Sequence, residues 1–304
     1  MKPLLEDLRR AKNFDVEPYV KEKIDKINDF FLTERLDSAV IGLSGGIDSS
    51  IVVALLCLAA REKNSPIRIV KGISLPIHTR GVSGQEDSVR FVQEYLLPYM
   101  ENYNSFRYEL KDLTSVMKEF ILNEYTNDFA KGQLAAIIRT PYLYFSVAKM
   151  QVDDFRPIVV GTTNRDEGAY IGFFGKASDA MVDLQPIADI HKSEVYKVAE
   201  YLKIPRKIID RDPTGDIFDG STDKELIRAP YDMIEYHQLL DDHDFKPNDA
   251  IYYHSDFLER RYIFNCFEKI EEIHRKNVHK YKVGMSSRFI DVLPRITKNL
   301  QGWK

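Results

Sequence analysis

The segment AVIGLSGGIDSSIVVALLCLAA, at residues 39–60, constrains the fold of this chain more than any other part. An apolar stretch leads into two adjacent glycines and an aspartate, and a second apolar stretch follows directly. A short apolar run that ends at glycines is typical of a buried strand, whereas the longer run has the length of a helix. The segment therefore predicts a buried strand at 37–43, a glycine loop, and a buried helix at 49–61.

The same alternation continues along the chain. Apolar or alternating stretches predict further strands at 67–76, 105–110 and 155–164. Helical spacing of apolar residues predicts helices at 17–35, 83–100, 131–151 and 193–205, with Pro141 as a kink in the third. Strands separated by helices predict an α/β fold, a doubly wound parallel sheet with helices on both faces.

Ligands of such sheets bind where the carboxyl ends of the strands meet. The loops that follow Leu43, Leu75 and Val160 are therefore expected at one edge of the sheet. The first of them joins a strand to a helix N-terminus, where backbone N–H groups and the helix dipole favour an anion. Gly45 and Gly46 let a phosphate approach the backbone closely.

Hydroxyl and carboxylate side chains complete this loop. Ser44, Ser49 and Ser50 can donate hydrogen bonds to phosphate oxygens. A carboxylate repels phosphate, so Asp48 is unexpected unless it holds a cation. Mg²⁺ binds carboxylates and bridges phosphates, and the loop therefore predicts a phosphate site with Mg²⁺ on Asp48.

Composition excludes several classes of protein. The 304 residues carry a net charge of -4, which gives no field for binding nucleic acid. The longest apolar run, residues 51–60, is too short to span a bilayer, and the charged N-terminus is not a signal peptide. Cys57 and Cys266 form no CxxC pair and are expected to be reduced core thiols of a cytoplasmic protein. We expect no membrane partner and no nucleic-acid partner.

The loop resembles a known phosphate-binding motif. The form Ser-Gly-Gly-x-Asp-Ser after an apolar strand is similar to the pyrophosphate loop of the N-type ATP pyrophosphatases, which cleave ATP between its α and β phosphates. It differs from the Walker motif, since no Gly-Lys-Ser/Thr ends it, and it differs from GxGxxG. The resemblance implies that the whole loop binds ATP, namely Leu43, Ser44, Gly45, Gly46, Ile47, Asp48, Ser49 and Ser50.

A second block narrows the resemblance to the NAD synthetase family. It comprises VVGTTNRDEGAYIGFFGKASDAMVDLQPIADIHKSEVYKVAEYL, then DPTGDIF and APYDMIEYHQLL. The family pattern runs Gly-Thr-x-x-x-x-Glu, Gly-(Phe/Tyr)-Phe-x-Lys, Asp-(Ile/Leu)-x-Pro and Pro-Thr-x-Asp. The resemblance covers about residues 20–285. It implies a Rossmann-like ATP pyrophosphatase fold and a single NAD synthetase-like domain over residues 1–304.

The resemblance implies roles for residues that match the motifs. Leu75, Thr162, Lys192 and Thr214 are implied to contact ATP, and Asp48 and Glu167 to hold Mg²⁺. Lys176, Asp183, the pair His279 and Lys280, and Arg139 are implied to bind the dinucleotide substrate. Asp48, Glu167 and Lys192 are the expected catalytic residues.

The family reaction needs no protein nucleophile. The nicotinate carboxylate of deamido-NAD attacks the α-phosphorus of ATP, pyrophosphate leaves, and ammonia then displaces AMP from the acyl-adenylate. Glutamine-using members carry an additional amidase domain, for which 304 residues leave no room. We therefore expect an ammonia-dependent NAD synthase with ATP as co-substrate, Mg²⁺ as cofactor and a homodimeric assembly through the N-terminal helix and the 131–151 helix.

Three departures from the family pattern leave the substrate open. The family segment Gly-Asn-x-x-Ala-Arg-x-Arg is GQLAAIIRT here, with Gln133 and Ile137 in place of the asparagine and the first arginine, and only Arg139 retained. The stretch EGAYIGFF is one residue longer than the family spacing, and KASDAMVD replaces Lys-Tyr-Gly-Asp. The chain could therefore also be an amide ligase of the same fold that acts on a different carboxylate substrate.

Several of the proposed site residues also have a simpler interpretation. Glu167 could be a solvated acid beside Asp166, Lys192 a surface lysine, and the pair at 279–280 part of a solvated basic run. A protein that binds ATP without turnover would also keep the glycine loop. Two carboxylates that hold one metal argue against such a sensor, because a pure binder does not need them.

Overall fold

The computed structural model describes residues 2–78, 84–121, 128–211, 227, 229–246, 256–280 and 288–289. Its strands form one six-stranded sheet in the order β3-β2-β1-β4-β5-β6, and every pairing is parallel. The strands are β1 (Ser38–Gly42), β2 (Ile69–Ser74), β3 (Phe106–Leu110), β4 (Pro157–Val160), β5 (Leu184–Gln185) and β6 (Arg288–Phe289). The chain builds β1 to β3 outward and then returns to the other side of β1, so the strand order reverses between β1 and β4.

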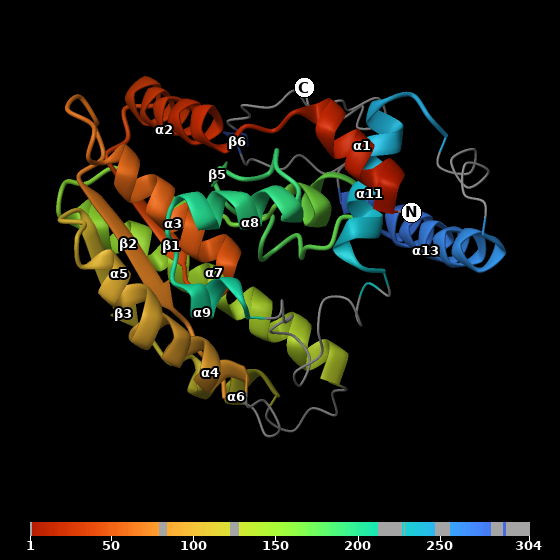
Figure 1. The fold of residues 1–304 in the computed structure, drawn as a ribbon. Coiled ribbons are helices and arrows are strands. Elements are labelled where there is room, and N and C mark those ends of the chain that lie inside the picture. The colour runs from red at the N-terminus through yellow and green to blue at the C-terminus, as the bar shows by residue number, and fades with distance from the viewer. Residues whose placement is uncertain are drawn as a thin grey trace.

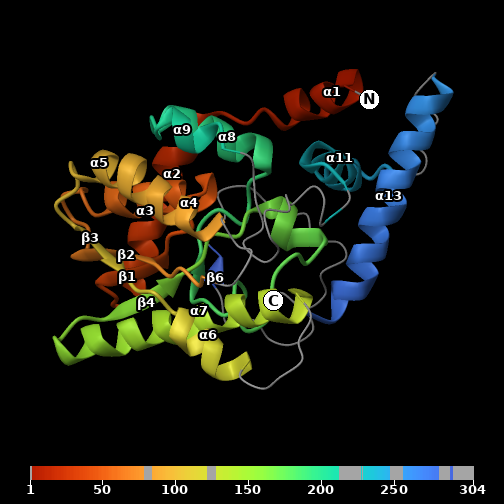
Figure 2. The same cartoon turned by 90° about the horizontal axis from the view of Figure 1, so that it is seen from below.

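Helices cover both faces of this sheet (Figures 1 and 2). On one face, α2 (Val16–Thr33), α3 (Ile47–Ala59) and α8 (Lys192–Tyr201) pack against one another. On the other face, α6 (Thr114–Ile121) packs on α7 (Asp128–Val152), which contacts β1 and β4. The remaining short helices on the first face are α4 (Gly84–Phe91), η1 (Val92–Leu96), α5 (Leu97–Met100) and α9 (Arg206–Ile209).

Alternation along the strands explains the two layers. In β1, Ala39 and Ile41 belong to the cluster under α2, α3 and α8, whereas Val40 belongs to the cluster under α6 and α7. In β4, Val160 belongs to the first of these clusters and Val159 to the second. Successive side chains of a strand point to opposite faces, so continuous apolar strands need helices on both sides. The predicted doubly wound fold is confirmed.

A separate group of helices lies beyond one edge of the sheet (Figure 2). It contains α1 (Lys2–Lys12), α11 (Tyr231–Asp242) and α13 (Phe257–Asn277), followed by η4 (Val278–Lys280). A hydrophobic cluster of its own joins these helices. Arg9 of α1 also pairs with the buried Glu235 of α11 at 2.5 Å, and Lys12 pairs with Glu194 of α8 at 2.7 Å. The first ion pair joins two helices of this group, and the second connects the group to the sheet layer.

The two cysteines are divided between these two regions. Cys57 is fully buried in the cluster beneath α3, and Cys266 is buried in the α11–α13 cluster. Both are free thiols, as predicted. Burial raises the pKa of the Cys57 thiol to about 12 and also raises that of Cys266.

Most predicted elements are present, with one interruption. The helix predicted at 83–100 is confirmed over its described residues, 84–100, and it contains a π-helical turn, η1, between α4 and α5. Pro98 lies at the start of α5 and has no N–H to donate to the preceding turn, which favours a wider turn before it. Pro141 lies inside α7, as predicted.

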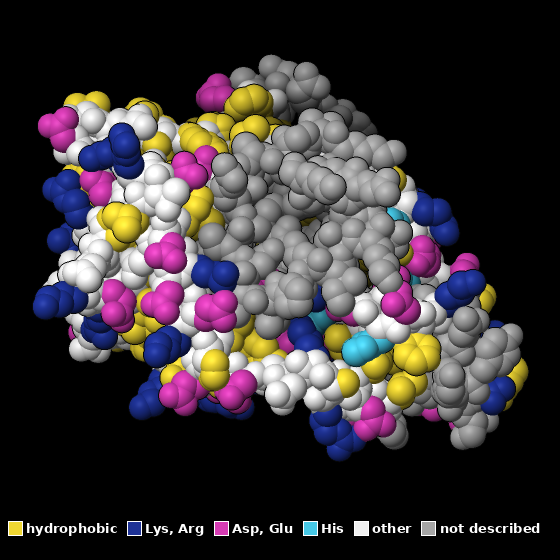
Figure 3. Space-filling view, turned by 90° about the horizontal axis from the view of Figure 1, so that it is seen from above, with side chains coloured by type: hydrophobic (Ala, Val, Ile, Leu, Met, Phe, Trp, Pro, Cys, Tyr) yellow, Lys and Arg dark blue, Asp and Glu magenta, His cyan; other side chains and the backbone are white. Residues whose placement is uncertain are grey.

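The distribution of surface charge and the apolar length of the helices concern the expected lack of nucleic-acid and membrane partners. On the face shown in Figure 3, Lys and Arg side chains are interspersed with Asp and Glu. No helix in the described ranges has the length and apolar character needed to cross a membrane.

Candidate active site

A cavity opens where the strand order reverses. It has a volume of about 320 Å³ and is lined by the carboxyl-terminal ends of β1, β2 and β4. Its walls include Leu43, Leu75 and Thr162, each from a different strand-end loop. This is the expected position of a ligand in an open α/β sheet, and the three loops predicted to meet there do so.

The loop between β1 and α3 forms the floor of the cavity. Gly45 has a φ of +74°, and a Cβ there would lie 2.6 Å from the carbonyl oxygen of Ser88, so only glycine fits. Gly46 is the N-cap of α3 and has no side chain with which to cap the first-turn N–H groups. The N-terminus of α3 therefore presents uncapped amides and the positive end of its dipole to the cavity.

The three serines of this loop have different surroundings. Ser44 lines the cavity. Ser50 is fully buried and its hydroxyl donates to the Gly46 carbonyl at 2.8 Å. Ser49 donates to the same carbonyl at 3.1 Å and lies 3.2 Å from the Ser44 hydroxyl. The predicted contacts of Ser49 and Ser50 with ATP remain predictions, and in this structure both hydroxyls support the loop.

Two carboxylates and one ammonium group converge beside the loop. The Lys192 Nζ lies 2.5 Å from Asp48 Oδ2 and 3.6 Å from Glu167 Oε1. Asn164 is fully buried and its amide donates to both carboxylates, at 3.0 Å to Asp48 and 2.8 Å to Glu167. Asp48, Glu167 and Lys192 come from three separate elements and line one cavity. Neither Glu167 nor Lys192 is an isolated surface side chain.

A buried pair fixes the elements that carry Glu167 and Lys192. Asp166 Oδ1 lies 2.7 Å from Nδ1 of His191, and Asp166 Oδ2 accepts the backbone N–H of Lys192 at 2.7 Å. Both side chains of the pair are fully buried. Burial raises the pKa of Asp166 to about 7 and lowers the pKa of His191 well below its ordinary value. The short π-helix η2 (Asp166–Tyr170) is thereby attached to the first residues of α8.

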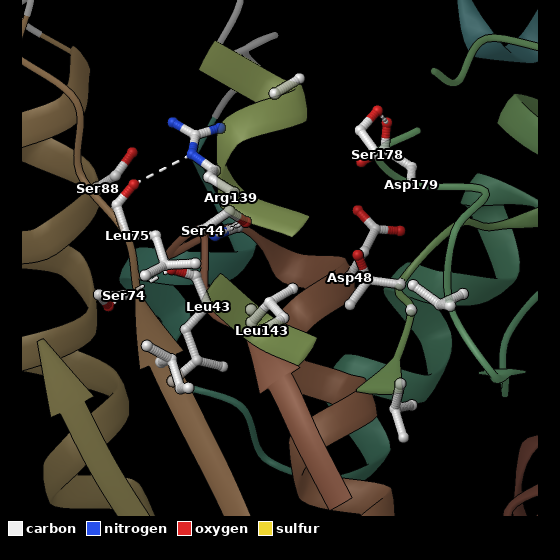
Figure 4. A pocket seen from close by; sticks show the side chains of 18 of the residues that line it. Leu43, Ser44, Asp48, Ser74, Leu75, Ser88, Arg139, Leu143, Ser178 and Asp179 are labelled. Atoms are coloured by element: carbon white, nitrogen blue, oxygen red, sulfur yellow. Dashed lines mark hydrogen bonds between the residues drawn. The ribbon is translucent and has the colours of Figure 1, made fainter. Parts of the chain in front are cut away.

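The opposite wall of the cavity comes from α7 and β2 (Figure 4). Arg139 reaches from α7 to the end of β2, where its Nε donates to the carbonyl of Leu75 at 3.1 Å. Asp48 lies across the cavity from Arg139, and Ser178 and Asp179 from the segment before β5 also line it (Figure 4). The cavity therefore has the glycine loop below, Arg139 on one side and carboxylates on the other.

Arg211 adds a second cation beside the glycine loop. Its guanidinium approaches the Gly45 carbonyl at 3.4 Å and the Ser88 hydroxyl at 3.2 Å. It also lies 4.6 Å from the ring centroid of Phe91, so α4 holds it over the loop. A guanidinium in this position suits an anion bound at the N-terminus of α3.

The structure does not bring every predicted site residue to the cavity. Among the described residues, those that line it are Leu43, Ser44, Gly46, Ile47, Asp48, Leu75, Arg139, Thr162, Glu167 and Lys192. Lys176 is exposed, and Asp183 accepts the backbone N–H of Val159 in β4. Asp179, rather than Asp183, faces the cavity. Thr214 lies outside the described residues.

The predicted pair near the C-terminus has backbone partners. Nδ1 of His279 lies 2.9 Å from the carbonyl oxygen of Lys276 within the same helical segment. Nζ of Lys280 donates to the carbonyls of Gly172 and Phe174, at 2.8 and 2.6 Å. Both are predicted substrate ligands, and that assignment remains a prediction.

Sequence reasoning missed Asn164, Arg211 and Tyr231. The Tyr231 hydroxyl donates to Glu167 Oε1 at 2.8 Å, and its ring centroid lies 5.1 Å from Lys192 Nζ. Asn164 follows β4 at the same sheet edge as Thr162, which is a signal that could have identified it. Arg211 follows α9, and Tyr231 is the first residue of α11. No local sequence pattern predicts that either residue lies at the site.

The strand order and the position of the cavity define a doubly wound α/β protein with a Rossmann-like fold. A sequence model of the family described as NAD synthase matches residues 19–284. The chain belongs to the NAD synthase family. It is 32% identical over 222 residues to the NH(3)-dependent NAD(+) synthetase of Methanocaldococcus jannaschii, covering 71% of this chain and 75% of that protein.

Three further proteins are similar to this chain over a larger share of its length. The protein of the same name from Thermoplasma volcanium is 28% identical, over 88% of this chain and 98% of its own. A solved NMN synthetase from Francisella tularensis shares the fold with a TM-score of 0.67 and 23% identity, covering 89% of this chain and 98% of that one. An NH3-dependent NAD synthetase from Campylobacter jejuni has a TM-score of 0.64 and 22% identity, over 92% and 100% of the two chains.

Proposed function

We propose that this chain is an ammonia-dependent NAD synthase. It converts deamido-NAD, ATP and ammonia to NAD, AMP and pyrophosphate through an acyl-adenylate. The convergence of Asp48, Glu167 and Lys192 beside the N-terminus of α3 carries the proposal. The named relatives that cover most of the chain support the choice of substrates.

The carboxylate pair fits Mg²⁺. Both carboxylates contact the same ammonium and the same amide, so their oxygens face one small region. In the part of the chain that the structure describes, no group of three or more His, Cys, Asp or Glu side chains could hold a metal ion. Mg²⁺ commonly takes one or two carboxylates and completes its shell with phosphates and water, so Asp48 and Glu167 suffice. When bound, Mg²⁺ would neutralise charge on the ATP phosphates.

The chain's own groups account for the first step. The N-terminus of α3 binds phosphate oxygens of ATP, and glycine at 45 permits the close approach. The substrate carboxylate attacks the α-phosphorus and pyrophosphate leaves. Negative charge then shifts onto the leaving phosphates, where Lys192 and Arg211 can stabilise it.

The second step needs an open path for ammonia rather than a protein nucleophile. Ammonia attacks the activated carbonyl carbon, AMP leaves, and one proton is released from the attacking nitrogen. Asp179 lines the same cavity and is a carboxylate placed to accept that proton. Both steps use one cavity, so the adenylate does not have to move between sites.

A second candidate is amidation of a different carboxylate by the same activation. Ile137 favours it, because an aliphatic side chain stands on α7 next to Ala136 of the cavity wall, where the family pattern has an arginine. Without that cation, a smaller acid with fewer phosphates than deamido-NAD would lose less binding energy.

We also propose a homodimer and a cytoplasmic location. Several large apolar side chains of α6 and α7 are exposed, including Phe120 at 61%, Phe145 at 56% and Val152 at 84%. An exposed apolar face of this kind suits a second copy of the chain, and light scattering would measure the resulting mass. Two buried free thiols suit a reducing compartment. We treat residues 1–304 as one functional domain.

The deciding experiment measures AMP and NAD made from ATP, Mg²⁺, deamido-NAD and ammonium, with glutamine in a parallel reaction. NAD formed with ammonium but not with glutamine is the expected result. Nicotinate mononucleotide and simple carboxylic acids serve as competing substrates. Faster AMP formation with one of these acids than with deamido-NAD would make that acid the proposed substrate. ATP binding without AMP formation in the presence of any tested acid would exclude this enzymatic activity.

A further inference from the structure

One face of α13 changes from apolar to polar along its length. Ile263, Phe267 and Ile270 are buried against α11. The same face continues three to four residues apart with His274, Asn277 and, on η4, Lys280. Residues at this spacing lie on one side of a helix. The apolar part of the face therefore packs α13 on α11, and the polar part contacts a different segment of the chain.

The polar part of this face contacts consecutive backbone carbonyls that begin at Tyr170, the last residue of η2. Nδ1 of His274 donates to the carbonyl of Tyr170 at 2.7 Å, and Nδ2 of Asn277 donates to that of Ile171 at 2.8 Å. Nζ of Lys280 donates to the next carbonyl, that of Gly172, and to that of Phe174. The stacked rings of Tyr170 and His274, 4.1 Å apart between centroids, add to the contact.

The segment needs such support because η2 is a single π-helical turn. A turn of this kind has little stability of its own, and the last carbonyls of any helix lack partners within it. Gly172 has a φ of +61° and ends the turn. The stretch EGAYIGFF is one residue longer than the family spacing, and a wide turn accommodates one extra residue. The donors of α13 and η4 bind these carbonyls, and the Gly172 carbonyl also accepts the Phe174 N–H at 2.9 Å.

The supported segment carries two parts of the candidate active site. Its second residue is Glu167, which faces Asp48 and Lys192. Its continuation places Phe173 on the cavity wall, and the Phe173 N–H donates to the Glu167 carbonyl at 2.9 Å. Movement of the carbonyls at 170–174 would therefore move the Glu167 backbone and Phe173 together.

We propose that His274, Asn277 and Lys280 are positioning residues that hold Glu167 at the metal site by binding the carbonyls at the end of η2. The proposal rests on the metal role of Glu167 in the proposed function. It gives Lys280 a role through the backbone, in place of the predicted direct contact with the dinucleotide. The three donors come from outside the sheet, so the α11–α13 group completes the active site.

The test compares two lysines of the same helical segment. Lys280→Met keeps the aliphatic stem and removes both hydrogen bonds to carbonyls. Lys276→Met is the matched control, because Lys276 is 70% exposed and pairs with Glu272 on the outer side of α13. Binding of Mn²⁺ in the presence of a non-cleavable α,β-methylene ATP analogue is measured by electron paramagnetic resonance, which does not depend on turnover.

Lys280→Met is expected to weaken Mn²⁺ binding about fivefold to tenfold, the usual effect of losing one or two hydrogen bonds, while Lys276→Met leaves it unchanged. Lys280→Arg should restore most of the affinity, since a guanidinium can donate to both carbonyls. Unchanged Mn²⁺ binding in Lys280→Met, with a raised KM for deamido-NAD, would overturn the proposal in favour of direct substrate contact.

Coupling to Glu167 separates positioning from general loss of structure. In a Glu167→Gln background, Lys280→Met should have little further effect on Mn²⁺ binding, because the group it positions is already gone. Additive effects would contradict the proposal. If Lys280→Met does not fold, Asn277→Leu tests the same coupling. If wild-type enzyme binds the Mn²⁺–nucleotide complex but makes no NAD, the proposed function fails while this test still applies.

Discussion

The two halves of the candidate active site are built in different ways. The glycine loop at 43–50 takes its shape from its own residues and from the strand and helix that it joins. The segment 161–192 takes its shape from distant elements, through Asp166 with Gln238 of α11 and through Tyr170 to Phe174 with α13. Bonds within the local sequence form most of the first half, which adds Arg211 as a distant contact, whereas the second half depends throughout on long-range packing.

Asp48→Asn tests the locally determined half and has the largest expected effect. The substitution removes one proposed metal ligand without changing the size of the side chain, so AMP formation should fall about 1,000-fold or more. Circular dichroism and thermal unfolding should show an intact fold. Asp29→Asn, an exposed carboxylate on α2, is the control. Retained turnover in Asp48→Asn would remove the metal role of this residue.

Asn164→Ala tests the junction between the two halves. The side chain contacts Asp48 and Glu167, and its Oδ1 accepts the Glu167 backbone N–H at 3.1 Å. Its loss removes the acceptor of the half-buried Glu167 N–H and a donor to each carboxylate, which costs about 1–3 kcal/mol of unfolding free energy. We expect kcat to fall about tenfold, because the two carboxylates lose a shared support. Urea unfolding and steady-state kinetics measure the two effects, and an unchanged kcat would contradict the bridging role.

Glu271→Gln tests the distant support of the second half through pH. A hydrogen bond from His237, with another from Tyr170, lowers the pKa of Glu271 to about 2. A lowered carboxyl pKa stabilises the fold at pH values above the ordinary pKa near 4.5, and this contribution is lost as the pH falls toward about 2. The variant should therefore lose less stability on acidification than wild type, as measured by urea unfolding at several pH values.

Glu272 provides the control for this prediction. Its pKa is also lowered to about 2, by Lys269 and Lys276, but one of these partners, Lys276, is 70% exposed, whereas the His237 partner of Glu271 is 2% exposed. Salt screens exposed pairs more than buried ones, so any effect of Glu272→Gln should vanish at high ionic strength while that of Glu271→Gln persists. Equal salt sensitivity of the two variants would argue against shielding of Glu271 by the buried His237.

Ile137→Arg has the smallest expected effect and concerns the substrate. Ile137 is 40% exposed on α7, one residue from the cavity wall. An arginine there restores the cation of the family pattern, and its exposed charge should lower the KM for deamido-NAD about threefold. Val152→Arg, at the far end of the same helix and 84% exposed, should leave KM unchanged. No difference between the two variants would mean that this enzyme anchors the dinucleotide elsewhere.

The difference between the two halves also explains what the sequence could predict. Apolar strands and the glycine loop are local patterns, and they located β1 to β4, α3 and the residues from Leu43 to Asp48. The two-residue strands β5 and β6 are too short to leave a pattern. Thr162, Glu167 and Lys192 came from family motifs and lie at the cavity.

The remaining site residues depend on contacts that no local pattern encodes. Asn164 and Tyr231 bind Glu167 across the site, and Arg211 approaches the glycine loop from the end of α9. The length of EGAYIGFF was visible in the sequence, but its resolution as a π-helical turn depends on donors from α13, about 100 residues further along the chain.

The placement of the two cysteines gives each region its own reporter of local opening. A buried thiol with a raised pKa reacts with a disulfide reagent only when the structure around it opens. Cys57 lies in the sheet cluster and Cys266 in the α11–α13 cluster, so Cys57→Ser and Cys266→Ser each leave a single thiol that reports on one of them. The labelling rate of each variant under native conditions gives the free energy of opening of one region. The helical region that supports the π turn can thus be ranked against the sheet without unfolding the protein.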